Sequence, residues 1–154
     1  MTRRLLTNRF EDALQYAARL HANQKRKGTD IPYISHLLAV TALVLEDGGD
    51  EDQAIAALLH DAVEDQGGFK RLEEIRSRYG STVAMIVDGC TDSYQVPKLP
   101  WRERKESYLR RLPTEPNEVM RVSLADKLHN ANTIRRGLEQ SGRMSTSQLP
   151  GELA

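Results

Sequence analysis

The segment at residues 58–65, Leu-Leu-His-Asp-Ala-Val-Glu-Asp, constrains this chain most, because it sets four polar side chains into an apolar run. In a helix, residues four apart lie one above the other, so His60 falls beneath Glu64. By the same spacing Asp61 falls beneath Asp65. An adjacent His and Asp can both reach one ion, while two carboxylates one turn on can orient or deprotonate a bound water. We therefore predict a helix that carries a catalytic metal site, with both metal ligands and groups that act on a bound water.

An ion needs more than two ligands, and the sequence offers few, because it has four histidines and one cysteine. His36 and Asp126 each stand as a polar residue within an apolar pattern, in Tyr-Ile-Ser-His-Leu-Leu and Ser-Leu-Ala-Asp-Lys-Leu. With His60 and Asp61 they give two imidazoles and two carboxylates. This set leaves positions for water and substrate on a six-coordinate Mn²⁺ or Fe²⁺, and it lacks the thiolates of a structural zinc site. Any one of these residues alone is more simply a core or capping residue, but the ordered set favours a metal site.

Elsewhere, apolar residues recur with the 3.6-residue period of amphipathic helices, and no segment alternates like a strand. Asn8, Ser35 and Asp50 stand where helix caps are expected. The helix that carries the central motif is predicted between Asp50 and Gly67, and Phe69 is expected to point inward. The fold class we predict is all-α, a bundle of about six to seven helices. The other predicted helices cover residues 10–23, 36–46, 69–79, 82–89, 101–112 and 115–138.

Length and charge limit the classes of function. The 154 residues predict one domain at 1–138, followed by a polar tail at 139–154 that we expect to be disordered. Lys plus Arg and Asp plus Glu both number 22, so the net charge of zero gives no general attraction for DNA, RNA or an anionic membrane. The single cysteine, Cys90, excludes an internal disulfide framework, and no apolar run of membrane-spanning length follows the N-terminus. We expect a soluble cytoplasmic protein, and monomer or homodimer stays open.

The two remaining histidines and the cysteine are interpreted as structural. His21 closes the apolar face of the first predicted helix and is expected to be a buried packing residue. His129 lies about 60 degrees away from the direction of Asp126 on a helix, so we expect it to orient a neighbour or to pack. Cys90 has no cysteine partner and is expected to pack as a small residue.

Two further features lie near the predicted ligands. The loop at 24–32 carries three consecutive cations, among them Arg26 and Lys27. Such a triplet is usually a solvated basic turn, but beside a metal site a guanidinium can lie on a purine face and an ammonium can meet phosphate. Asn130 stands one turn after Asp126 on the same polar stripe, where its amide can reach a ribose hydroxyl or a phosphate. These residues indicate a nucleotide as ligand.

The order of these motifs resembles the HD superfamily of metal-dependent phosphohydrolases, and within it the alarmone-hydrolase branch, which comprises the hydrolase half of RelA/SpoT proteins and the small alarmone hydrolases. The motifs that carry the resemblance, over roughly residues 8–137, are Gln24-Lys25-Arg26-Lys27-Gly28, Pro32-Tyr33-Ile34-Ser35-His36, His60-Asp61-Ala62-Val63-Glu64-Asp65 and Ala125-Asp126-Lys127-Leu128-His129-Asn130. The chain departs from many relatives at Leu37, where they have proline, and at Ser123, where they have lysine. The family usually continues with a further helix that helps to cover the site, and residues 139–154, which show no apolar period, are not expected to form it.

The resemblance implies an HD-domain fold and a reaction. The reaction is the hydrolysis of the 3′ pyrophosphate of guanosine 3′,5′-bis(diphosphate)-type alarmones, the nucleotides of the stringent response, to pyrophosphate and GDP or GTP. It also implies one divalent ion, Mn²⁺ in the first place. The implied metal ligands are His36, His60, Asp61 and Asp126; the catalytic groups are Glu64 and Asp65; and the substrate contacts are Arg26, Lys27, Asn130 and Lys105. For Lys105 a surface role is an equal alternative.

Two other functions stay open. One is another nucleotide phosphohydrolase of the superfamily, including one for adenosine alarmones, because stacking by Arg26 does not distinguish purines. The other is a non-catalytic HD module that binds a nucleotide or a partner protein as a sensor. Release of orthophosphate instead of pyrophosphate would indicate the first alternative, and binding without product would indicate the second.

Overall fold

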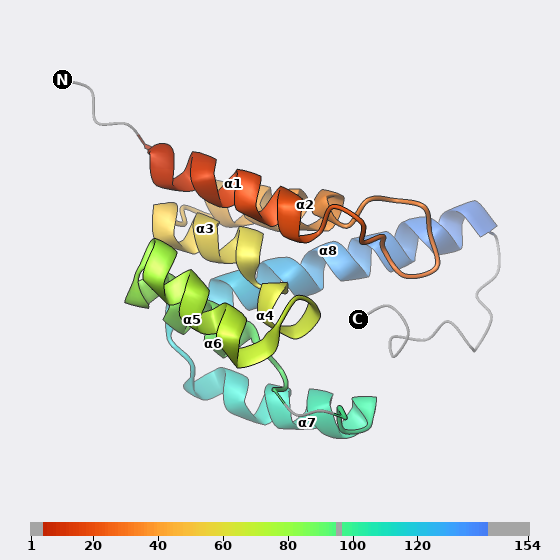
Figure 1. The fold of residues 1–154 in the computed structure, drawn as a ribbon. Coiled ribbons are helices and arrows are strands. Elements are labelled where there is room, and N and C mark those ends of the chain that lie inside the picture. The colour runs from red at the N-terminus through yellow and green to blue at the C-terminus, as the bar shows by residue number, and fades with distance from the viewer. Residues whose placement is uncertain (1–4, 95–96, 142–154) are drawn as a thin grey trace.

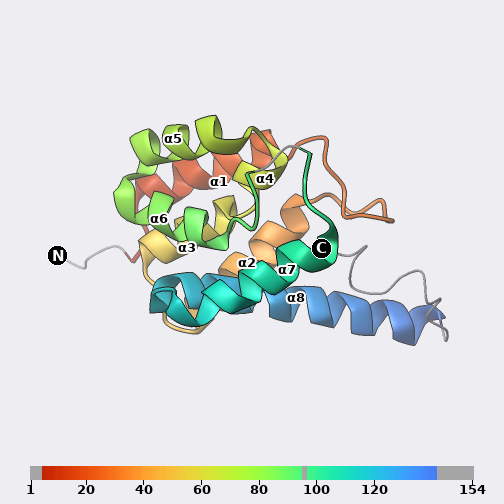
Figure 2. The same ribbon diagram turned by 90° about the horizontal axis from the view of Figure 1, so that it is seen from below.

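The structure of the chain is a computed structural model that describes residues 5–94 and 97–141 (Figures 1 and 2). Within these residues the regular structure is helical, with one isolated antiparallel bridge between Lys25 and Pro32, so the predicted all-α fold class is confirmed. The elements are α1 (Asn8–Leu20), α2 (Ile34–Glu46), α3 (Glu51–Leu59), α4 (Ala62–Asp65), α5 (Gly68–Tyr79), α6 (Ser81–Cys90), α7 (Trp101–Arg111), the 3₁₀ turn η1 (Leu112–Thr114) and α8 (Asn117–Ser141).

Helix α3 forms the centre of the bundle. Every residue from Gln53 to Leu59 is buried, because this stretch of the sequence is apolar on nearly every side of a helix. Helices α1, α2, α6 and α8 all pack against it. In Figure 1 α3 lies among these helices, and His60 and Asp61 follow directly after its last residue.

Helices α6 and α8 approach each other closely at Gly89. A Cβ atom at this position would lie 2.7 Å from both γ-carbons of Val119. Any larger residue would therefore force the two helices apart, so Gly89 permits the close packing. From this contact α8 runs alongside α2, and its C-terminal half continues past the other helices (Figures 1 and 2).

Helix α7 is attached to the bundle in another way. Its sequence, Trp-Arg-Glu-Arg-Lys-Glu-Ser-Tyr-Leu-Arg-Arg, is rich in charge, and Tyr108 is its one buried residue. Figure 1 shows α7 at the edge of the molecule, away from α1 and α3. Its position must depend mainly on polar contacts, since it contributes so little apolar surface to the core.

One predicted helix cap is present and two are wrong. Asp50 caps α3, because its side chain accepts the backbone N–H of Gln53 at 3.0 Å. Asn8 is already the first residue of α1, and Thr7 is the cap, since its hydroxyl accepts a backbone N–H of the first turn. Ser35 lies inside the first turn of α2, which has no side-chain cap because the backbone is already helical one residue before α2 begins.

The predicted continuous helix through the central motif is also wrong, because a turn at His60 and Asp61 separates α3 from α4. Both turn residues keep right-handed helical dihedrals, with φ −61° and ψ −27° at His60 and φ −99° and ψ −3° at Asp61. The helical hydrogen bonding is interrupted here, but the backbone direction changes little. From this turn His60 and Asp61 both reach the same cluster of side chains.

Three further expectations concern the surface and the chain ends. Phe69 does not point inward; it is 65% exposed in the first turn of α5, where it meets the ring of Tyr94. Helix α8 continues to Ser141, past the predicted boundary at residue 138. The disordered tail remains a prediction, because residues 142–154 lie outside the described residues. None of the helices in the described ranges is long and apolar enough to span a membrane.

Candidate metal centre

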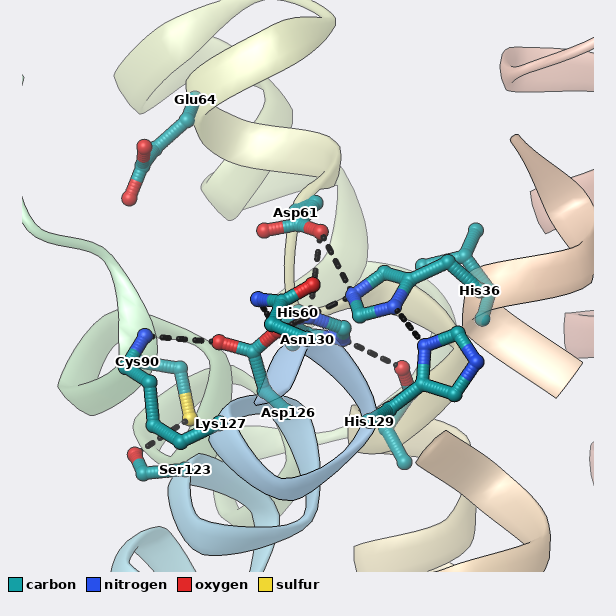
Figure 3. A network of polar contacts seen from close by, with 12 residues as sticks. His36, His60, Asp61, Glu64, Cys90, Ser123, Asp126, Lys127, His129 and Asn130 are labelled. Atoms are coloured by element: carbon teal, nitrogen blue, oxygen red, sulfur yellow. Dashed lines mark hydrogen bonds and ion pairs between the residues drawn. The ribbon is translucent and has the colours of Figure 1, made fainter. Parts of the chain in front are cut away.

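Four polar side chains converge where α2, the α3–α4 junction and α8 meet (Figure 3). Nε2 of His36 lies 3.0 Å from Oδ1 of Asp126 and 3.7 Å from Oδ2 of Asp61. Nε2 of His60 lies 3.1 Å from Oδ2 of Asp61 and 3.5 Å from Oδ1 of Asp126. Ligand atoms that bind one divalent ion at about 2.1 Å, at right angles, are about 3 Å apart. His36, His60 and Asp126 each place a ligand atom within 4.8 Å of the other two, so these three suit one shared ion, and Oδ2 of Asp61 lies beside both imidazoles.

The orientation of the His60 ring also fits a metal ligand. Its Nδ1 lies 2.7 Å from the carbonyl oxygen of Ala57, so Nδ1 carries the proton of the neutral ring and Nε2 presents a lone pair. This Nε2 atom is buried and has no hydrogen-bond partner among the described residues. It faces carboxylate oxygens of Asp61 and Asp126. A lone pair and carboxylate oxygens repel one another unless a cation lies between them, so the arrangement fits a divalent ion.

The pKa values of the cluster residues show that the cluster favours positive charge. Burial disfavours the charged imidazole of His60, but Asp61 and Asp126 outweigh burial and raise the pKa of His60 well above its ordinary value. Without an ion Nε2 of His60 therefore takes up a proton, and a divalent ion bound between the ring and the carboxylates would displace that proton. Burial also disfavours the carboxylate of Asp126, but the imidazoles of His36 and His60 hold its pKa well below the usual range. The cluster therefore keeps its carboxylates ionised and attracts a cation.

His36 is oriented by His129, the one histidine of α8. Nδ1 of His36 lies 2.7 Å from Nδ1 of His129. Burial, together with the nearby His36, lowers the pKa of His129 to about 4, so His129 is neutral at physiological pH. When His129 accepts the Nδ1 proton of His36, the lone pair of His36 Nε2 faces the cluster. His129 thus has the geometry of an orienting residue.

The two carboxylates are held by neighbours as well. Oδ2 of Asp61 accepts the hydroxyl of Tyr33 at 2.5 Å. Oδ2 of Asp126 accepts Nζ of Lys127 at 2.8 Å, and its Oδ1 accepts the amide of Asn130 at 3.1 Å. Because each of these bonds restricts rotation of a carboxylate, the oxygens that face the imidazoles are fixed in place.

A cavity opens from this cluster toward α7 and the loop before α2. The charged residues of its wall are Arg26, Lys27, Asp61, Glu64, Asp92, Lys105, Asp126 and Lys127. Cations and carboxylates thus line the same space. A phosphate group that meets a metal ion on one side and donors on the other needs such a wall.

Glu64 reaches this cavity from α4 (Figure 3). Its Oε1 accepts the backbone N–H of Asp92 at 2.7 Å, and its Oε2 lies 3.8 Å from Nζ of Lys98. Burial raises the pKa of Glu64 to about 7. A carboxyl group with a pKa near neutrality can act as a general base at physiological pH.

Asp65, the neighbour of Glu64, is placed differently. It is exposed and does not belong to the cavity wall formed by the described residues. Its Oδ2 accepts the side-chain amide of Gln24 at 3.0 Å. The structure therefore places Glu64, and not Asp65, in the wall of the cavity that opens from the metal cluster, and the catalytic role of Asp65 stays a prediction.

The four predicted substrate contacts line the cavity: Arg26, Lys27, Lys105 and Asn130. Arg26 donates to Oδ1 of Asn130 at 3.1 Å. Lys105 donates to Oδ2 of Asp92 at 2.8 Å, and Arg104 donates to both oxygens of the same carboxylate. These cations are therefore held at the wall by partners that a phosphate group could replace.

Three residues of the site are absent from the sequence prediction: Tyr33, Asp92 and Lys127. Tyr33 lies one helical turn before His36, and Lys127 directly follows Asp126, so adjacency to a ligand is the signal that could have identified them. Asp92 follows Cys90 in a segment without periodicity, and no local pattern marks it. The thiol of Cys90 also lines the cavity, but burial raises its pKa to about 11, so it remains protonated and cannot serve as a thiolate ligand.

Known proteins share both the sequence and the fold. A sequence model described as HD domain matches residues 13–149. The chain is 38% identical over 128 residues to the guanosine-3′,5′-bis(diphosphate) 3′-pyrophosphohydrolase of Xenopus tropicalis, covering 81% of this chain and 69% of that protein. It is 40% identical over 128 residues to a GTP pyrophosphokinase of Streptomyces coelicolor, but spans only 15% of that protein's length. A solved structure of a metazoan SpoT orthologue that hydrolyses ppGpp superposes with a TM-score of 0.76 at 29% identity, covering 88% of this chain and 74% of the other.

Proposed function

This chain belongs to the HD domain family, and we propose that it hydrolyses the 3′ pyrophosphate of guanosine 3′,5′-bis(diphosphate)-type alarmones. The observation that carries the proposal is the joint position of an acidic metal cluster and phosphate-binding cations in one cavity. The Xenopus relative has this activity in its name, and the chain covers 69% of its length. The products would be pyrophosphate and GDP or GTP.

We propose Mn²⁺ as the ion, held by His36, His60, Asp61 and Asp126. Two imidazoles and two carboxylates suit Mn²⁺ or Fe²⁺ and leave positions open for substrate, while the protonated thiol of Cys90 adds no soft ligand. When bound, the ion polarises a phosphoryl oxygen and lowers the pKa of a nearby water.

Glu64 is the residue we assign as general base. It receives the proton of the attacking water, while the water oxygen forms a bond to phosphorus and the bond between that phosphorus and the 3′ oxygen breaks. The departing 3′ oxygen gains a proton and becomes the ribose hydroxyl. Asp65, bonded to Gln24 outside the cavity wall, is assigned a weaker supporting role at the end of α4.

The cations of the wall are assigned to the substrate. Lys27 and Lys105 bind phosphate oxygens, and the guanidinium of Arg26 lies against the purine. Asn130, one helical turn from Asp126, donates to the ribose or a phosphate. Because stacking does not distinguish purines, these residues leave adenosine alarmones as substrates to be tested.

The test is incubation of the purified protein and Mn²⁺ with guanosine and adenosine 3′-pyrophosphates, with separate detection of pyrophosphate and orthophosphate. We expect pyrophosphate from the guanosine compound. Orthophosphate would instead indicate another nucleotide phosphohydrolase of the superfamily. Tight binding without any product would indicate a nucleotide sensor and would contradict the proposal.

A further inference from the structure

Tyr33 connects the loop before α2 to the metal cluster. Its ring lies between two histidines, with centroid distances of 5.3 Å to His21 and 5.6 Å to His36. Its hydroxyl donates to Oδ2 of Asp61 at 2.5 Å, and this same oxygen faces Nε2 of His60 at 3.1 Å. Packing alone would be satisfied by phenylalanine, so the hydroxyl requires an explanation of its own.

We propose that Tyr33 is a positioning residue for the metal centre: its hydroxyl fixes Oδ2 of Asp61 toward the two imidazoles and so raises the affinity for the divalent ion. The inference rests on the metal centre of the proposed function, but not on the identity of the nucleotide. It assigns a role to a side chain that lines the cavity and would act on the ion through Asp61.

Asp61 has particular need of such support. It lies in the turn between α3 and α4, outside both helices. In the absence of the hydroxyl, its carboxylate could rotate about the Cβ–Cγ bond, because that terminal torsion is broad. The hydrogen bond from Tyr33 selects one orientation and brings Oδ2 within 3.7 Å of the second imidazole nitrogen, on His36.

Tyr33 is itself held by a backbone hydrogen bond and by the packing of its ring. Its backbone N–H donates to the carbonyl oxygen of Gln24 at 2.8 Å. The His21 ring beneath it is buried, and Nδ1 of His21 lies 2.7 Å from Oε1 of the same Gln24, which fixes the plane of that ring. The hydroxyl is the donor in its bond to Asp61, because an ionised carboxylate oxygen only accepts. The donor therefore arrives at Asp61 in a fixed position.

The test is the substitution Tyr33→Phe, which removes only the hydroxyl oxygen. We compare Mn²⁺ dissociation constants of the wild-type protein and Tyr33→Phe, measured by the electron paramagnetic resonance signal of free Mn²⁺ without nucleotide. The matched control is Tyr79→Phe, because the Tyr79 hydroxyl also donates to a carboxylate, Oδ2 of Asp12, at 2.5 Å, on a surface of the bundle away from the cavity. Thermal unfolding of all three proteins shows whether the fold is retained.

We expect Tyr33→Phe to bind Mn²⁺ about 10- to 100-fold more weakly, the usual effect of losing an outer hydrogen bond to a ligand, and Tyr79→Phe to bind like the wild type. A second measurement separates positioning from substrate contact. In the alarmone assay, excess Mn²⁺ should restore the activity of Tyr33→Phe, whereas a lost substrate contact would persist at saturating metal as a changed KM or kcat.

Two results would overturn the inference, and they are distinguishable from each other. Equal Mn²⁺ affinity in Tyr33→Phe and the wild type would remove the positioning role while leaving the proposed reaction intact. Absence of divalent-ion binding by the wild-type protein, tested with Mn²⁺, Fe²⁺ and Co²⁺, would refute the metal centre and the inference together.

Discussion

The two sides of the cavity are built by different interactions. On one side, α2, the end of α3 and α8 present the metal cluster from within the apolar core, and the side chains of His36 and His60 are 1% and 2% exposed. On the other side, α7 is held by charge: Arg104 and Lys105 pair with Asp92. The first side is fixed by packing, and the second by ion pairs and a few hydrogen bonds.

The difference corresponds to two chemical tasks. Metal ligands must keep their separations within a few tenths of an ångström, which a close-packed core provides. A nucleotide must enter and leave, so the wall that binds its phosphates gains from contacts that can be exchanged. Tyr108, whose hydroxyl donates to Ser123, is the one buried anchor by which α7 remains attached.

The largest effect is expected from a substitution that removes a metal ligand on the packed side. Asp61→Ala should lose the bound ion and the hydrolytic activity together, because an imidazole pair with one carboxylate no longer surrounds the ion. Metal analysis of the purified variant and the pyrophosphate assay measure the two losses. Asp47→Ala, at a 72% exposed side chain paired with Arg121 away from the cavity, serves as the control. An Asp61 variant that kept a full equivalent of metal would contradict the ligand assignment.

The next prediction compares how much an apolar side chain on each side contributes to the free energy of unfolding. Leu58→Ala, in the fully buried centre of α3, should lower the free energy of unfolding by about 2–5 kcal/mol. Leu109→Ala, on the exposed face of α7, should change it by less than about 0.5 kcal/mol. Urea unfolding of both variants gives the values. Similar losses in the two would mean that α7 belongs to the same packed core.

Glu64 lies at the border between the two sides, since it joins α4 to the backbone of Asp92. Glu64→Gln should keep the ion and lower kcat by about 10²-fold or more. The base must be ionised, and its pKa is raised to about 7 by burial, so wild-type kcat should fall as the pH drops below about 7. A kcat–pH profile of the variant should lack this acidic limb. Full activity in Glu64→Gln would assign the base elsewhere, with Asp65→Asn as the next variant to measure.

The smallest effect is expected from a substitution that weakens only the ion pairs holding α7. Asp92→Asn removes the anion that pairs with Arg104 and Lys105, so α7 should exchange its backbone amides faster, by about tenfold, while α3 stays protected. Hydrogen exchange followed by mass spectrometry measures both helices at once. Salt should act in the same direction on the wild type, because it screens ion pairs and leaves the apolar core unchanged. Uniform protection across α7 and α3 would remove the distinction between the two sides.

The packed side is also the side that the sequence predicts best. His36, His60, Asp61 and Asp126 are identifiable because each interrupts an apolar periodic pattern, and such a pattern determines which face of a helix meets the core. The charged side has no comparable periodicity. Asp92 could not be predicted because it lies in an irregular segment, and its partners come from a helix whose faces are nearly all polar.

One error at the centre has a local cause. The stretch around His60 and Asp61 contains no Gly or Pro, so local propensity predicts a continuous helix, whereas a turn at these two residues separates α3 from α4. The sequence pattern also does not distinguish Glu64 from Asp65. The structure places Glu64 in the cavity wall and Asp65 at an exposed position, and the catalytic role of Asp65 stays a prediction.

Helix α8 carries Asp126, Asn130 and Thr133 along one edge of the cavity. At 1.5 Å of rise per residue, the second and third lie about 6 Å and about 10 Å beyond the first along one straight rod. The interval between these side chains is set by the rise of the helix and not by a loop. Under the proposed function, a ligand that contacts both Asp126 and Asn130 would have to span that interval.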